Sequence, residues 1–196
     1  YSTAPPAPVF AGYQDGRAVE ARFNRPTGLA LDAAGNLYVA DTGNRCIRKL
    51  TPQGLVSTVT GTGERGFRDG PAAQAQFASP GGIAVDSAGN LYIADAENHR
   101  IRKVSPAGVV STLGGTGEKG DQDGPAAQSR FSNPTGVAVD VAGNVYVADM
   151  GIRTVSPAGV VGTLAGTRFE GKSVLDLEIA GHVAMDASRT FYITYG

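Results

Sequence analysis

Carboxylates recur along this chain, and they are the first residues that could do chemistry. One series is Asp32, Asp86, Asp140 and Asp186, and a second is Asp41, Asp95 and Asp149. A ring of such carboxylates could hold a cation. Each aspartate could instead accept backbone N–H groups within its own turn, as Asp commonly does. Because the residue returns in every copy of a repeat, we favour the structural role and predict neither a metal nor a cofactor.

The remaining candidates for metal or thiol chemistry are few. His99 and His182 are the only histidines, and they occupy non-equivalent places, which makes a poor metal site. Cys46 is the single cysteine, so an intrachain disulfide and a Cys-based zinc site are excluded. Its counterpart 54 residues later is Arg100, so we expect a buried or half-buried thiol with no task of its own.

No pattern typical of a nucleophile or of a phosphate loop is present. The repeated serines Ser57, Ser105, Ser111 and Ser156 lack a nucleophile-elbow context. The segments 61–63 and 115–117 both read Gly-Thr-Gly, but no Gly-Lys-Ser/Thr follows them. We therefore expect turns at these glycines and no catalytic residue.

The charges are balanced. The chain has 17 Lys and Arg and 18 Asp and Glu, a net charge of -1, which favours neither a nucleic acid nor an anionic membrane as partner. No apolar run approaches the length of a membrane span. The basic residues Arg45, Arg48, Lys49, Arg100, Arg102 and Lys103 could form a strip, of which the third copy keeps only Arg153. We expect them to pair with Asp41 or Asp95, or to lie on a solvated edge.

A 54-residue repeat must position these side chains. Its copies begin at Phe23, Phe77 and Phe131. Each has four short apolar segments bounded by Gly-Asn and Pro-x-Gly turns, which predicts antiparallel strands. In the first copy the segments are 28–32, 37–41, 47–50 and 55–60. The first two are apolar on successive residues, as in strands covered on both faces. Sheets stacked around an axis provide that cover, so we predict an all-β chain forming a β-propeller.

The connectors between the repeats are long, at 61–82 and 115–136. Asp-Gly-Pro at 69–71 and 123–125 predicts a short helical turn in each, and Phe77 and Phe131 should anchor the connectors in apolar pockets. All connectors fall on one face of a propeller, and insertions of this kind often mark the binding face.

These motifs resemble the NHL repeat. The resemblance lies in Pro-x-Gly-Leu/Ile/Val-Ala-x-Asp, then Gly-Asn-Leu/Val-Tyr-Val/Ile-Ala-Asp, then Asn-His-Arg-Ile-Arg-Lys at 98–103. The connectors are similar to those of long-repeat bacterial and plant members. The resemblance implies four-stranded blades and, by the family's habit, a six-bladed ring. It also brings two alternatives. One is a propeller-type lyase or hydrolase with an axial metal, which zinc-dependent lyases of similar fold hold with several histidines near the axis. The other is single-stranded RNA binding on a basic face.

The copies depart from the pattern in two places. The third lacks three residues, so Asp149-Met150-Gly151-Ile152 must turn more tightly and loses the counterpart of Asn44 and Asn98. The fourth has an altered turn at 187–190, and Tyr195 stands in place of the repeat aspartate. We therefore expect a linker and outer strand in residues 1–11 and a propeller section in 12–196, with repeats at about 12–61, 62–115 and 116–166 and a partial one at 167–196.

The sequence leads us to predict a non-catalytic protein-interaction or scaffold module of three full blades plus partial blades. Further blades would come from the same chain or from another. The start at Tyr1, followed by a Pro-rich stretch, favours a secreted or cell-surface location. A protein or peptide would bind the residues of the connectors that vary between copies. These candidate site residues are Glu64, Arg65, Phe67, Arg68, Glu118, Lys119, Asp121 and Gln122.

Overall fold

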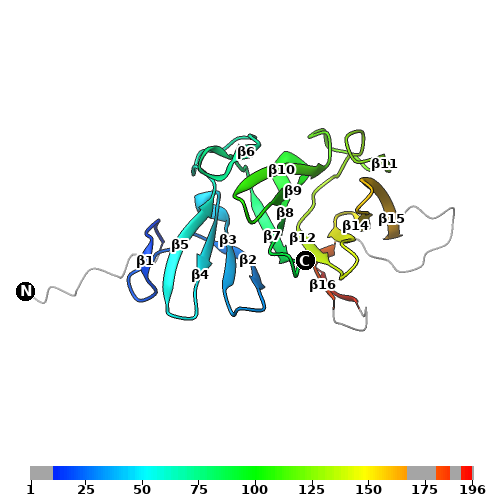
Figure 1. The fold of residues 1–196 in the computed structure, drawn as a ribbon. Helices are drawn as coiled ribbons and strands as arrows, with labels where there is room; N and C mark the ends of the chain where they lie inside the picture. Colours follow the sequence, from blue (N-terminus) through cyan, green and yellow to red (C-terminus); the bar gives the residue numbers. More distant parts are fainter. Residues whose placement is uncertain (1–10, 167–179, 186–190, 196) are drawn as a thin grey trace, which may run out of the picture.

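Three antiparallel sheets follow one another along the chain, and Figure 1 shows them side by side from β1 to β15. The computed structural model describes residues 11–166, 180–185 and 191–195. Each of the three sheets has five strands, and β16 (Ala180–Met185) pairs with β17 (Phe191–Tyr195) in a further one. The prediction of an all-β fold is confirmed.

The three sheets share one strand order, in which the strand met first in sequence lies beside the one met last. The first sheet has the order β1-β5-β4-β3-β2, and the other two repeat it. Its strands are β1 (Gly16–Arg17), β2 (Pro26–Leu31), β3 (Leu37–Asp41), β4 (Cys46–Leu50) and β5 (Leu55–Thr60). The second sheet holds β6 (Gly70–Pro71), β7 (Pro80–Val85), β8 (Leu91–Asp95), β9 (Arg100–Val104) and β10 (Val109–Gly114). The third holds β11 (Gly124–Pro125), β12 (Gly136–Val139), β13 (Val145–Ala148), β14 (Gly151–Val155) and β15 (Val160–Gly166).

The predicted four strands of each copy are found within two residues of their expected ends, but each blade has a fifth strand. The extra strand is two residues of the connector, paired antiparallel with the outermost strand of the blade that follows. In the second blade it is Gly70–Pro71 on β10, and a proline is tolerated there because an edge position needs no donor. The predicted number of strands in each blade, four, was therefore one too low.

The connectors are built largely as expected. A 3-10 helix, η2 (Ala72–Gln74), follows Pro71, while the same place in the next connector is a turn. Two further 3-10 helices, η1 (Thr42–Asn44) and η3 (Ala96–Asn98), join the second and third predicted strands of their blades. Phe77 and Phe131 are fully buried, which confirms their role as anchors.

The core lies between adjacent blades. Ala40 and Ile47 of the first blade pack with Phe77, Ile83 and Ile93 of the second. The second blade packs on the third in the same way, through Tyr92, Ala94 and Ile101 against Phe131, Val137 and Val147. Every residue of β8 is buried, as predicted for an inner strand covered on both faces.

The face of the first blade that points away from the second blade is exposed. Leu29 and Leu31 of β2 are 63% and 66% exposed, whereas Ile83, the counterpart of Leu29, is 5% exposed. The reason is that no described blade precedes β2. The expectation that further blades come from the same chain or another stays a prediction. The expected linker and outer strand at residues 1–11 fall almost entirely outside the described residues, and the altered turn at 187–190 lies wholly outside them.

Glycines let the innermost strands approach one another closely. β7 lies beside both β2 and β12. A Cβ atom added to Gly82 would lie 2.5 Å from the Gly136 Cα and 2.7 Å from the Thr135 carbonyl oxygen. Only a residue without a side chain fits between these two backbones, so the sheets can fan out from a common centre.

We expect Gly82→Ala to lower the free energy of unfolding by about 3 kcal/mol, because two backbones must move apart. Gly162→Ala is the matched control: it lies in an outer strand, and its new Cβ would meet nothing closer than the Thr154 Oγ1 at 3.6 Å. Urea unfolding of both variants checks this. Equal losses in the two variants would contradict the close approach of inner strands.

Candidate interaction face

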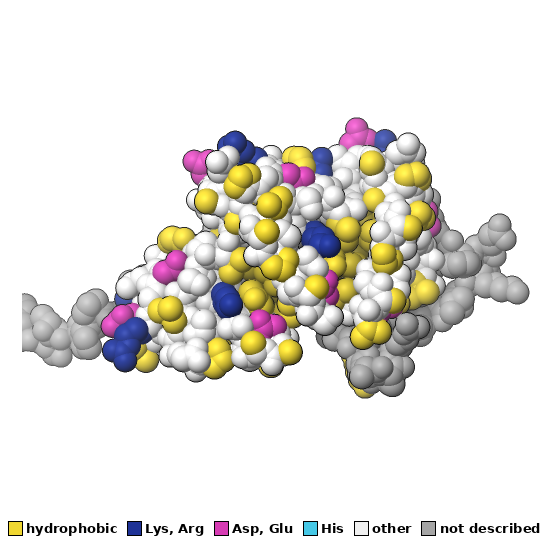
Figure 2. All heavy atoms as spheres, in the orientation of Figure 1, with side chains coloured by type: hydrophobic (Ala, Val, Ile, Leu, Met, Phe, Trp, Pro, Cys, Tyr) yellow, Lys and Arg dark blue, Asp and Glu magenta, His cyan; other side chains and the backbone are white. Residues whose placement is uncertain are grey.

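The connectors and the 3-10 loops lie at one end of the strands, which we call the connector face. Pro26 at the start of β2 pairs with Asp41 at the end of β3, and the end of β5 pairs with Ile47 near the start of β4. The tight turns at 32–36 and 51–54 therefore lie at the opposite end. In Figure 2 charged side chains of both signs lie over the segments around β6 and β11.

A buried arginine holds each connector to its blade. In the second blade Arg102 of β9 is fully buried. Its Nε and NH2 groups donate to Asp69 Oδ1 at 3.1 and 2.6 Å, and NH1 donates to Asp95 Oδ2 at 3.1 Å. The guanidinium also donates to the carbonyl oxygens of Gln76 and Arg68. Two carboxylates and two carbonyls thus saturate one cation, and three of these four acceptors belong to the connector.

The same clamp is present in the other two blades. Arg48 pairs with Asp15 and Asp41, and it donates to the carbonyl oxygens of Arg22 and Gln14. Arg153 pairs with Asp123 at 2.6 Å and with Asp149 at 3.6 Å. In each blade the Oδ2 atom of the connector aspartate accepts a backbone N–H group from the outermost long strand. The donor is Thr58, Thr112 or Thr163.

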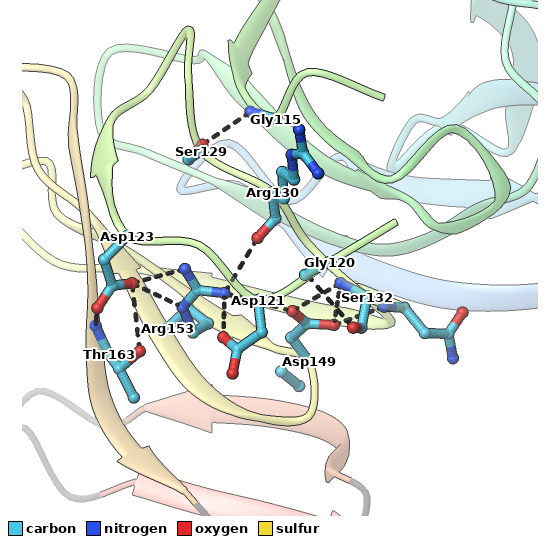
Figure 3. A network of polar contacts seen from close by, with 12 residues as sticks. Gly115, Gly120, Asp121, Asp123, Ser129, Arg130, Ser132, Asp149, Arg153 and Thr163 are labelled. Carbon is cyan, nitrogen blue, oxygen red and sulfur yellow. Dashed lines mark hydrogen bonds and ion pairs between the residues drawn. The ribbon is translucent and has the colours of Figure 1, made fainter. Parts of the chain in front are cut away.

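One connector position covers the arginine in three different ways. Tyr13 lies 4.9 Å from the Arg48 guanidinium, and Phe67 lies 4.8 Å from that of Arg102. In the third blade Asp121 takes this place and pairs with Arg153 NH1 at 3.0 Å (Figure 3). The contrast between Phe67 and Asp121 therefore reflects cation–π cover against charge pairing of the same buried group.

We expected the aspartates that end the second predicted strand to accept backbone N–H groups of their own turns, and this was wrong. Within those turns Asp41 and Asp95 accept only the side chains of Asn44 and Asn98. Asp95 is fully buried and accepts the backbone N–H groups of Ala78 and Ser79, which belong to the incoming connector. Asp41 accepts the N–H of Asn24 in the same way. These residues brace the start of the innermost strand because they lie next to it in the sheet. Burial raises the pKa of Asp149, against the lowering effect of hydrogen bonds from Asn133 and Ser132 and of the Arg153 charge.

The aspartates of the first series do serve their own turns. Asp86 accepts the N–H groups of Ala88 and Asn90, the Asn90 side chain and the Tyr92 hydroxyl. Burial alone would raise the pKa of Asp86, but the hydrogen bonds from Asn90 and Tyr92 outweigh it, so the pKa lies below its ordinary 3.8. Burial and the neighbouring carboxylate raise the pKa of Tyr92 to about 12. Asp186 lies outside the described residues.

The third blade replaces a missing side chain. Asn98 donates both to Asp95 Oδ2 and to the carbonyl oxygen of Gly66. The three-residue deletion removes its counterpart, and the tighter turn is closed by the Asp149 N–H donating to the Gly151 carbonyl oxygen. The Ser132 hydroxyl donates instead to the carbonyl oxygen of Gly120, the counterpart of Gly66 (Figure 3).

The predicted site residues lie in the connectors of the second and third blades, and most are exposed. Arg65 donates from Nε and NH2 to Glu97 Oε2, both at 3.0 Å, and Glu118 pairs with Arg130 at 2.6 Å. Glu64 accepts from the Gln76 side chain, and Arg68 donates to that of Gln74. Lys119 and Gln122 are also exposed, and the backbone of Gln122 pairs with Arg130. Phe67 and Asp121 also have a structural role, since each covers a buried arginine.

Sequence reasoning missed the connector aspartates Asp15, Asp69 and Asp123. A signal was present, because Asp-Gly returns at each of these places. The arginine follows 33 residues later in the first two copies and 30 later in the third, where three residues are absent. The expected pairing of Arg48 with Asp41 and of Arg102 with Asp95 is confirmed.

The remaining candidate residues from the sequence are the cysteine and the two histidines. Cys46 is buried, which raises the pKa of its thiol to about 12. His99 caps η3 in a left-handed conformation. The backbone of His182 lies in β16, and its side chain is outside the described set. Within the described residues no group of three or more His, Cys, Asp or Glu could hold a metal ion. No helix found in that part of the chain is long and apolar enough to cross a bilayer.

Comparison with known proteins identifies the repeat. The model of the NHL repeat matches residues 23–50, 77–104 and 131–151. The chain contains three NHL repeats. The arginine clamp is thus a feature of these NHL blades, with Arg48 and Arg102 inside the matched segments and Arg153 two residues after the end of the third.

Curated relatives are similar over part of the chain. Suppressor of quenching 1, a chloroplastic protein of Arabidopsis thaliana, is 37% identical over 94 residues, which are 47% of this chain and 9% of that protein. Human NHL repeat-containing protein 2 is 36% identical over 112 residues, which are 55% of this chain and 15% of the relative. Mouse teneurin-4 is 29% identical over 178 residues, 82% of this chain and 6% of its own length. The chain therefore spans a small part of each.

Solved structures are similar in fold. A chain of a nidogen/laminin complex has a TM-score of 0.60 at 21% identity, over 83% of this NHL chain and 53% of the other. Virginiamycin B lyase of Staphylococcus aureus has a TM-score of 0.60 at 11% identity, over 92% of this chain and 52% of the lyase. At these identities the likeness shows the propeller fold alone.

We expect Arg102→Met to lower the free energy of unfolding by about 3–5 kcal/mol, because it leaves buried Asp95 without its cation. Arg65→Met is the matched control, since the exposed Arg65–Glu97 pair contributes about 1 kcal/mol or less. Chemical denaturation of both variants measures the difference. Similar losses in both would show that the buried clamp is not what stabilises the blade.

We expect the stabilising effect of Asn90 to depend on pH. A lowered Asp86 pKa contributes stability above the ordinary value of 3.8, and this is lost as the pH falls through the folded-state pKa. Asn90→Ala should therefore destabilise the protein more at about pH 6 than at about pH 3. Carboxyl NMR should show Asp86 titrating below 3.8 in the wild type and closer to it in the variant. A pH-independent difference would refute this.

Proposed function

We propose that this NHL propeller section is a non-catalytic module that binds a protein or peptide through its connector face. The observation that carries the proposal is a division of labour among charged residues. The arginines that recur in every copy are paired with carboxylates inside the blades, as with Arg102 and Asp95. The charged side chains that vary between copies stay exposed on a connector whose backbone carbonyl oxygens accept hydrogen bonds from the buried arginine. A rigid scaffold with variable exposed loops is a common arrangement for recognition.

The fold is compatible with this function. A chain of the same fold was solved within a nidogen/laminin complex, and so occurs in an assembly with protein. The fold also occurs in a lyase, so it does not by itself distinguish binding from catalysis. The proposal therefore rests on the exposed side chains and not on the likeness.

The arrangement of the arginines speaks against the RNA-binding alternative. Arg48, Arg102 and Arg153, which a basic strip would need, are buried and already paired with carboxylates. They cannot contact a phosphate backbone without breaking the clamp. A secreted or cell-surface location stays part of the proposal, although one relative is chloroplastic.

The test is a comparison of two double variants by chemical cross-linking in an extract of the source cells. Glu64→Ala/Arg68→Ala changes the connector face at exposed, weakly stabilising pairs. Gln53→Ala/Ser87→Ala changes exposed turns at the opposite end. We expect the first variant to lose the proteins that the wild type captures and the second to keep them. The reverse pattern, or retention by both, would overturn the proposal.

A further inference from the structure

A polar cavity opens on the connector face where the first and second blades meet. Its volume is about 510 Å³. Three arginines line it, Arg25 and Arg45 from the first blade and Arg65 from the connector. The other polar residues of the wall are Asn24 and Thr42 of the first blade and Ser79 and Glu97 of the second. With three guanidiniums and one carboxylate, these side chains carry a net charge of +2.

The guanidiniums are poorly saturated by the protein. Arg25 is exposed and makes no hydrogen bond or ion pair with any described residue. Arg45 has one weak bond, from NH1 to the Gly63 carbonyl oxygen at 3.3 Å. Arg65 uses Nε and NH2 on a single oxygen of Glu97. Each guanidinium has five N–H donors, so most of them are free to face a ligand.

The cluster is specific to this junction and is not a property of the repeat. Ser79, His99 and Lys119 stand 54 residues after Arg25, Arg45 and Arg65, at the junction of the second and third blades. Arg25 also has a left-handed backbone, with φ of 51°, whereas Ser79 does not. Such a conformation is costly for a residue with a side chain and tends to mark functional positions. By contrast, the buried arginines of the clamp occur in all three blades.

We propose that this cavity binds the carboxylates of an acidic segment of a protein partner, an inference that rests on the proposed function. A guanidinium and a carboxylate can form two parallel N–H···O bonds, and the site already shows a carboxylate paired with Arg65. Arg25 and Arg45 bind the incoming carboxylates. The cavity is larger than one carboxylate, so flanking peptide enters with it.

The test uses a fluorescein-labelled dodecapeptide of alternating glutamate and glycine, with a glutamine–glycine peptide as control. Fluorescence anisotropy should show salt-dependent binding of the first alone. The triple variant Arg25→Ser/Arg45→His/Arg65→Lys gives the cavity the residues of the next junction, which the repeat accommodates. It should bind about tenfold more weakly or worse, because charge-assisted hydrogen bonds are lost. The reciprocal variant His99→Arg/Lys119→Arg, which leaves Ser79 in the wall of the first cavity unchanged, should gain additional binding at the second junction. Circular dichroism checks that both fold.

Several results would overturn the inference. They are equal binding of the two peptides, unchanged binding by the first triple variant, or displacement of the peptide by inorganic phosphate at lower concentration than by acetate. Glu64→Ala/Arg68→Ala should leave peptide binding intact, because neither residue lines the cavity. If partner capture depends on Glu64 and Arg68 but the acidic peptide does not bind, this site falls and the proposed function stands. If the peptide binds but capture does not depend on the connector face, the proposed function falls.

Discussion

A guanidinium buried between a blade and its connector is the constraint on which the rest of this structure depends. Arg102 and its two counterparts lie on the middle strand of their blades, yet most of their acceptors belong to the connector. Burying a cation without partners would be costly, so the connector backbone must adopt the one path that brings its carbonyls and carboxylate to the arginine. The same path places two connector residues against the outermost long strand, and this makes the blade a five-stranded sheet.

This constraint connects the core with the surface. Asp95 ties the arginine to the N–H groups that precede β7, so the start of the innermost strand is fixed by the same network. Connector side chains then project from a backbone held at both ends. Residues such as Glu64 and Lys119 can vary between copies without disturbing the blade, because they contribute nothing to the clamp. Phe67 and Asp121 are less free, since they also cover the buried cation.

The sequence predicted what is local and missed what is distant. The first and last residues of strands such as Leu37–Asp41 and Leu91–Asp95 were predicted correctly because turn residues lie on both sides of each strand. The turn role of Asp86 was predicted because the aspartate recurs in every copy and Asp commonly accepts N–H groups of its own turn. Asp69 was missed because its partner lies 33 residues later, and the burial of Arg102 cannot be read from residue type alone. The cavity at Arg25 depends on two blades meeting, so only the three-dimensional structure reveals it.

The most direct test of this account is hydrogen exchange at individual amides in Arg102→Met. The connector of the second blade contains the backbone pair of Arg68 and Gln76, whose carbonyl oxygens both accept from Arg102. The account predicts that these amides lose protection in the variant while those of β8, held between neighbouring strands, keep theirs. Protection that is unchanged in the connector, or lost equally in β8, would contradict it.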